Sequence, residues 1–89
     1  MISRNVTIIN RLGLHARAAT RLVNCASEFK AEVHLKKGAR SVNGKSIMGV
    51  LTLAAATGTE LTIETHGVDE PLAMAALIQL INNRFGEDE

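Results

Sequence analysis

The sequence has no tryptophan or tyrosine, only two phenylalanines, one proline and one cysteine, Cys25. Because it lacks aromatic rings that stack on bases, it is unsuited to the stacking mode of RNA binding. A single cysteine excludes an internal disulfide framework. No stretch approaches the ~18 apolar residues of a membrane span, and no charged segment followed by an apolar run marks a signal peptide. We therefore expect a cytoplasmic protein without membrane insertion.

Charge of neither sign dominates, since ten basic and nine acidic residues give a formal net charge of +1. A dedicated binder of nucleic-acid phosphates carries a clear basic excess, so we expect no nucleic-acid partner. What the sequence does contain is a hydrophobic fraction of 46%, almost all of it aliphatic. That is enough for the core of one domain over residues 1–89, which would bury ~60–65% of its unfolded surface.

Four segments have the residue pattern of β-strands: 2–9, 30–37, 40–42 and 60–66. The first contains a β-branched run, and the second and fourth alternate between apolar and polar residues. In 30–37 this alternation places His34 on the polar side, facing solvent. The sheet is therefore predicted to have one buried and one solvated face.

Three helices are predicted from apolar residues that recur at helical spacing. The first has about three turns. Cys25 lies on or beside its apolar stripe, so we expect a small packed side chain and not a reactive thiol. Ser46 caps a short second helix whose apolar positions are 47, 50, 51 and 54. Asp69 caps the last helix, which ends at Gly86. Its buried stripe is at positions 73, 76, 77 and 80, flanked by Ile81. The acidic tail 87–89 is expected to be frayed.

The predicted order of elements is β-α-β-β-α-β-α. Strands this short need helices against one face, while their polar residues occupy the other. We therefore predict an α+β fold, an open-faced β-sandwich in which three helices cover one face of a four-stranded antiparallel sheet.

A histidine and an arginine lie two residues apart where the first helix begins, at His15 and Arg17. A helix start favours an anion by ~0.3–1 kcal/mol, and by up to ~2 kcal/mol in sheltered geometry. His15 occupies the N-cap position, which histidine fills poorly compared with serine or aspartate. A neutral imidazole can attack phosphorus with its own lone pair, and Arg17 can donate to a phosphoryl oxygen. The same pair is also compatible with an idle, solvated surface.

The segment GLHARAA at positions 13–19 closely resembles the active-site signature of the histidine-containing phosphocarrier HPr family, and the nitrogen-branch relative NPr carries a similar motif. The resemblance covers essentially the whole chain, with a second matching block, GKSIMG, at 44–49. It implies that His15 accepts a phosphoryl group on its pros nitrogen from phosphorylated Enzyme I, whose donor is phosphoenolpyruvate, and passes it to a IIA-type protein. Arg17 would stabilise the phosphate, and the backbone amides of Ala16 and Arg17 would bind its oxygens. No metal or cofactor is implied.

The main departure from the family pattern is Ala18, where many members have proline, a residue that pre-sets the backbone of the first helical turn. The second block superficially matches a nucleotide-binding P-loop, but that motif would need glycine at position 39, which is Ala39. Ser46 is a plain N-cap or, by the resemblance, a regulatory site for an HPr kinase/phosphorylase. Phosphorylation there would add a charge of about −1.5 to −2 that repels an acidic partner.

A carrier that serves several partners needs a shared contact patch with an apolar centre. The resemblance places this patch on the first two helices and suggests the docking residues Ala16, Thr20, Arg21, Asn24, Ile47, Met48 and Thr52. The spacing of Ile47 also fits a core position. We expect a monomer. An alternative function keeps the fold without the relay: a regulatory protein-binding module whose phosphorylation at His15 or Ser46 signals metabolic status. Sugar uptake and nitrogen-branch regulation both remain open.

Overall fold

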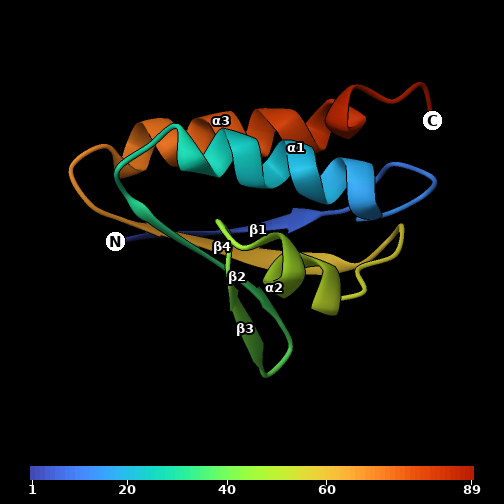
Figure 1. The fold of residues 1–89 in the computed structure, drawn as a ribbon, viewed down its shortest axis with the longest axis horizontal. Helices are drawn as coiled ribbons and strands as arrows, with labels where there is room; N and C mark the ends of the chain where they lie inside the picture. Colours follow the sequence, from blue (N-terminus) through green and yellow to red (C-terminus); the bar gives the residue numbers. More distant parts are fainter.

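The computed structural model describes residues 1–89, and its elements follow the predicted order (Figure 1). A short 3-10 helix, η1, comes after the last α-helix. The elements are β1 (Ile2–Thr7), α1 (Ala16–Ser27), β2 (Glu32–Lys37), β3 (Arg40–Asn43), α2 (Ile47–Thr52), β4 (Glu60–His66), α3 (Glu70–Asn82) and η1 (Arg84–Gly86).

The four strands form one antiparallel sheet in the order β1-β4-β2-β3. On its inner face Leu35 of β2 lies opposite Ile63 of β4, and both are fully buried. The outer face is polar, with an ion pair between Lys36 and Glu64 (3.1 Å). The helices lie on the inner side of the sheet (Figure 1), so the predicted open-faced α+β sandwich is confirmed.

The core is formed where α1 and α3 pack on the inner face of the sheet. Leu22 of α1 and Leu77 of α3 are fully buried, as their spacing predicts, and burying each such side chain contributes ~1.5–3 kcal/mol. Cys25 is half-buried at the edge of the α1 stripe, where burial and the neighbouring Glu28 carboxylate raise the pKa of its thiol. The predicted α3 stripe is confirmed at Ala73 and Leu77 and at the flanking Ile81, all of which are buried. Ala76 and Leu80 are only half-buried, and Met74 is buried instead.

The second helix is shorter than its apolar spacing indicates. It ends at Thr52, and Ala54, predicted to be a core position, is exposed with a φ of 50°. Leu53 takes the buried place, and its carbonyl oxygen accepts a hydrogen bond from Lys37 Nζ at 2.9 Å. This tertiary contact uses a carbonyl at the helix end, so the chain turns there instead of continuing as a helix.

Asp69 stands at the N-cap of α3 as predicted, but its side chain does not cap the helix. Its two carboxylate oxygens accept hydrogen bonds from the backbone N–H groups of Lys30 (2.9 Å) and Ala31 (2.8 Å), just before β2. These bonds lower the pKa of Asp69. The prediction of a capping bond is therefore wrong, because the carboxylate links the start of α3 to the segment that enters β2.

The prediction of a last helix that continues to Gly86 and a frayed tail is also wrong. After α3 ends, η1 carries Phe85 into the core, where its ring is only 1% exposed. Arg21 of α1 donates a hydrogen bond to the Phe85 carbonyl oxygen, and Arg11 binds Glu89 through its backbone N–H (2.6 Å) and an ion pair. Burial of the ring thus turns the acidic tail back onto the loop that precedes α1.

Candidate functional site

His15 is the N-cap residue of α1, as the sequence predicts. Its backbone is extended (φ −79°, ψ −178°), its carbonyl oxygen accepts the N–H of Ala19 at 2.8 Å, and its side chain makes no capping hydrogen bond. The N–H groups of Ala16, Arg17 and Ala18 therefore have no acceptor within the helix. The helix start consequently offers three donors and the positive end of its dipole beside the imidazole.

The loop that delivers His15 is held by a close backbone approach at Gly13. Gly13 has a φ of +69°, and a Cβ at this position would lie 2.7 Å from the carbonyl oxygen of Ala55. That oxygen accepts the N–H of Leu14 at 2.8 Å. The segment after α2 thus fixes where α1 begins, and a side chain at position 13 would push this contact apart.

The side chain of His15 is 28% exposed, and its Nε2 atom contacts the Oε2 atom of Glu87. The other carboxylate oxygen of Glu87 accepts a hydrogen bond from Asn10 Nδ2 at 2.9 Å. The Asn10 amide and then the imidazole lower the pKa of Glu87, because both favour its ionised form. The acidic tail that was expected to be frayed is therefore part of the surroundings of His15.

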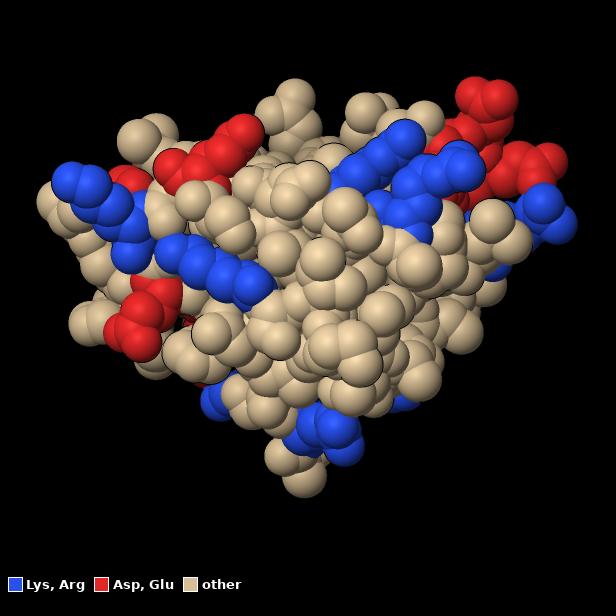
Figure 2. All heavy atoms as spheres, in the orientation of Figure 1, with Lys and Arg blue, Asp and Glu red and all other residues tan.

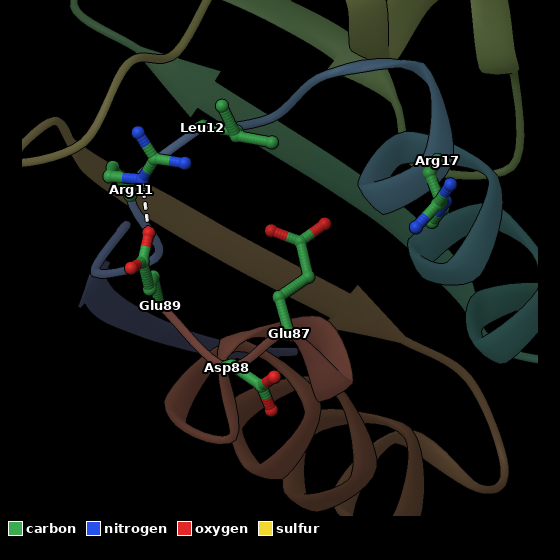
Figure 3. Close-up of a pocket in the computed structure, with 6 residues that line it drawn as sticks. All are labelled: Arg11, Leu12, Arg17, Glu87, Asp88 and Glu89. Atoms are coloured by element: carbon green, nitrogen blue, oxygen red, sulfur yellow. Dashed lines mark ion pairs between the residues drawn. The ribbon is translucent and has the colours of Figure 1, made fainter.

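Arg17 lies on the same end of α1 with an exposed side chain that takes part in none of the four ion pairs. It borders a cavity of about 300 Å³ together with Arg11, Leu12 and the tail residues 87–89. Figure 3 shows the Glu87 carboxylate pointing into the space between Arg11 and Arg17. The lining of this cavity thus joins Glu87, which contacts His15, with a guanidinium that takes part in no ion pair and can bind an anion.

Ala18, which departs from the proline that many members of the resembled family have at this position, is fully buried in the first turn of α1. The helix begins at Ala16 with alanine at position 18. Proline is therefore not required for the helix start to form.

Ser46 is the N-cap of α2, and its Oγ accepts the N–H of Gly49 at 3.1 Å. The capping role predicted from the sequence is confirmed. The next two residues, Ile47 and Met48, are 40% and 72% exposed, so Ile47 is not a core residue. An exposed apolar pair thus follows the cap.

The seven predicted docking residues are all exposed, on α1 and α2. These helices contact one another. Figure 2 shows a broad area without charged side chains in the middle of the viewed face, with basic side chains above and below it. Three of the seven donate internal hydrogen bonds. Thr20 Oγ1 donates to the carbonyl oxygen of Ala16 (2.8 Å), Arg21 donates to that of Phe85, and Thr52 Oγ1 donates to that of Gly49 (2.6 Å). The structure thus leaves all seven predicted residues exposed, on two helices that contact one another.

Sequence reasoning missed Asn10 and Glu87. The sequence indicates only that Asn10 follows a strand, and no neighbouring residue in the sequence predicts that its side chain is completely buried. The one available signal for Glu87 was the apolar Phe85 beyond the last helical stripe, since a large apolar side chain near a chain end can anchor it in the core. No group of three or more His, Cys, Asp or Glu side chains is arranged to hold a metal ion. No helix is both long and apolar enough to cross a bilayer.

Comparisons with known proteins place this site in a family. Residues 2–83 match the family model described as PTS HPr component phosphorylation site. The chain is 54% identical over 89 residues to phosphocarrier protein HPr of Neisseria meningitidis, covering all of both chains. It is also similar to the crystal structure of HPr-C-His from Thermoanaerobacter tengcongensis, with a TM-score of 0.97, 38% identity and complete coverage of both chains. A crystal structure of an HPr dimer from the same organism has a TM-score of 0.79 and 39% identity, and covers 98% of this chain and 100% of its own.

These similarities define the class as a bacterial phosphocarrier of the phosphotransferase system. Within that class, the chain belongs to the HPr family. Membership implies interaction with phosphotransferase-system proteins as donor and acceptor. The expected monomeric state stays a prediction.

Proposed function

We propose that His15 accepts a phosphoryl group from phosphorylated Enzyme I and transfers it to a IIA-type protein. The observation that carries this proposal is the placement of a partly exposed imidazole at an uncapped helix start, beside three backbone donors and the unpaired Arg17. Each charge-assisted hydrogen bond from Arg17 to a phosphoryl oxygen would contribute ~1.5–3 kcal/mol. The amides of Ala16 and Arg17 would bind the remaining oxygens.

The proposal is tested by incubating the protein with Enzyme I and labelled phosphoenolpyruvate. The expected product is an acid-labile, base-stable phosphoprotein. His15→Ala should take up no label, whereas His34→Ala and His66→Ala, at histidines on the sheet, should be labelled like the wild type. Label on the His15→Ala protein would overturn the assignment.

A relay also requires the phosphoryl group to leave. Addition of a IIA-type protein should discharge the labelled protein, and comparison of the sugar-branch and nitrogen-branch forms of Enzyme I and of IIA should reveal which branch reacts faster. A phosphohistidine that no IIA-type protein discharges would instead favour a regulatory binding module. Docking through the exposed side chains of α1 and α2 is supported by the exposure of two apolar residues, Ile47 and Met48.

Ser46 is proposed as a regulatory site on this docking surface. Its hydroxyl is at the start of α2, directly before the exposed Ile47 and Met48. A phosphate here, added by an HPr kinase/phosphorylase, would place a charge of about −1.5 to −2 at the docking surface. Ser46→Asp should therefore be phosphorylated on His15 more slowly than Ser46→Ala, and equal rates would exclude this mode of regulation.

A further inference from the structure

We propose that Glu87 is a positioning residue for His15: its carboxylate holds the Nε2–H of the imidazole and leaves the Nδ1 lone pair to attack phosphorus. The inference rests on the proposed phosphoryl transfer at His15 and adds to it a residue 72 positions away in the sequence. Glu87 is mostly buried, with a side chain only 12% exposed. It is not a member of the sequence motif that carries the resemblance.

Both oxygens of the Glu87 carboxylate are held. Oε2 contacts His15 Nε2, and Oε1 accepts a hydrogen bond from Asn10 Nδ2 at 2.9 Å. Asn10 is fully buried and donates from the same nitrogen to the carbonyl oxygen of Gly13 at 2.8 Å. Its Oδ1 atom has no partner. The amide must present its NH₂ group here because both neighbours are acceptors, even though this leaves a buried oxygen unpaired, which is unfavourable.

The acceptor character of the carboxylate determines the tautomer of the ring. An ionised carboxylate has no proton to donate, so the imidazole nitrogen that it contacts must carry the hydrogen. In a neutral imidazole the other nitrogen, Nδ1, is then the one with the free lone pair. The contact therefore selects which of the two nitrogens of His15 is the nucleophile, and it restrains the rotation of the ring.

The transfer step balances with this arrangement. The Nδ1 lone pair forms the new N–P bond, the bond between phosphorus and the phosphorylated donor protein breaks, and its electron pair stays with the donor. The ring keeps its Nε2 proton and gains positive charge, which the Glu87 carboxylate offsets on the opposite edge of the imidazole. This is the role that a carboxylate has when it orients a catalytic histidine and stabilises the imidazolium that forms.

The position of Glu87 is fixed by contacts on either side of it in the chain. Phe85 is anchored in the core and its carbonyl oxygen accepts a hydrogen bond from Arg21, while Glu89 pairs with Arg11 through Nε and Oε2 at 2.5 Å. Asp88, between them in sequence, is exposed and forms no ion pair. Asp88 is thus a matched control, since it has a similar charge in the same tail without contact to His15.

The first test measures the tautomer directly, by ¹⁵N NMR of the imidazole nitrogens in the full-length protein up to about pH 9, well above the ordinary histidine pKa of ~6.5. In the wild type we expect His15 to show the Nε2–H form alone. Glu87→Ala should give a mixture with the Nδ1–H form, while Glu87→Gln, which retains an acceptor oxygen, and Asp88→Ala should match the wild type. The resonances of the other two histidines should not change. Identical tautomer populations in wild type and Glu87→Ala would overturn the inference.

The second test measures the rate of phosphoryl transfer from phosphorylated Enzyme I. Loss of the carboxylate that orients a metal-binding histidine typically costs ~10–100-fold in affinity or activity. By analogy we expect Glu87→Ala to react at least about tenfold more slowly with unchanged affinity for Enzyme I. Glu87→Gln should lose less, and Glu60→Ala, at an exposed carboxylate on β4 outside the cavity, should lose nothing. A Gln variant as slow as the Ala variant despite the retained tautomer would refute the positioning role. Label on His15→Ala would contradict the proposed function but leave the tautomer result standing, so the two failures are distinguishable.

Discussion

Replacement of Gly13 by alanine should destabilise the protein by more than its backbone conformation alone requires. An L-residue in the left-handed region costs ~1–2 kcal/mol, and Gly13 has a φ of +69°. The added Cβ would also lie 2.7 Å from the carbonyl oxygen of Ala55 and 2.9 Å from the Cα atom of Ala56. Because both neighbours are backbone atoms, relief requires a shift of the chain, and overpacking of this kind costs ~1–3 kcal/mol. Together we expect a loss of ~2–5 kcal/mol.

The matched control is Gly38→Ala, at a glycine with a similar φ of +59° and nothing within 4 Å of a built Cβ. It should lose only the conformational cost of ~1–2 kcal/mol. Since the chain has no tryptophan or tyrosine, unfolding in urea is followed by far-UV circular dichroism. With an m value of ~1 kcal/mol/M, Gly13→Ala should unfold at a urea concentration lower than Gly38→Ala by ~1–3 M. Equal midpoints for the two variants would refute the close approach at Gly13.

Three further predictions concern stability. The hydrogen bonds that lower the pKa of Asp69 contribute stability that is fully present above its ordinary pKa of 3.8 and is lost as pH falls through the lower folded-state pKa. In urea titrations, Asp69→Asn should therefore lose less stability than the wild type between about pH 7 and pH 3. An unchanged pH dependence would contradict this. Leu77→Ala, at a fully buried side chain, should cost ~2–5 kcal/mol, whereas Leu72→Ala, at a side chain 66% exposed, should cost ~0.5 kcal/mol or less in the same assay. Ser46→Ala should lose ~0.5–2 kcal/mol with the N-cap bond, and a loss no larger than that of the exposed Ser41→Ala would argue against the cap.

The strands and the sheet faces could be predicted because their signal is local. In β4 the burial of Leu61, Ile63 and Thr65 alternates with that of their neighbours, following the period of two that the sequence shows. The helix start at His15 was predictable for the same reason, since β-branched residues before it and helical spacing after it bracket the cap. A recurring pattern over six to twelve residues specifies an element before any tertiary contact forms.

The ends of elements were less predictable, because tertiary partners compete for their free backbone groups and side chains. The spacing of apolar residues predicts that α2 extends to Ala54. The helix ends at Thr52, and Lys37 donates a hydrogen bond to the carbonyl oxygen of Leu53, directly after it. Asp69 has the residue type and position of a cap, yet two N–H groups from a segment 38 and 39 residues away bind its carboxylate. Such choices depend on which donors the fold brings near, and no local pattern encodes them.

Residue patterns were sufficient to predict the open-faced α+β sandwich, the histidine at the start of the first helix and, through its motifs, the resemblance to the HPr family. The surroundings of that histidine depend instead on contacts between distant segments. Glu87 and Asn10 are 77 positions apart, and they meet at His15 because Phe85 is buried and turns the tail back across the loop before α1. Local residue types specify where a helix begins, but contacts between distant residues exist only once the hydrophobic core has brought those segments together.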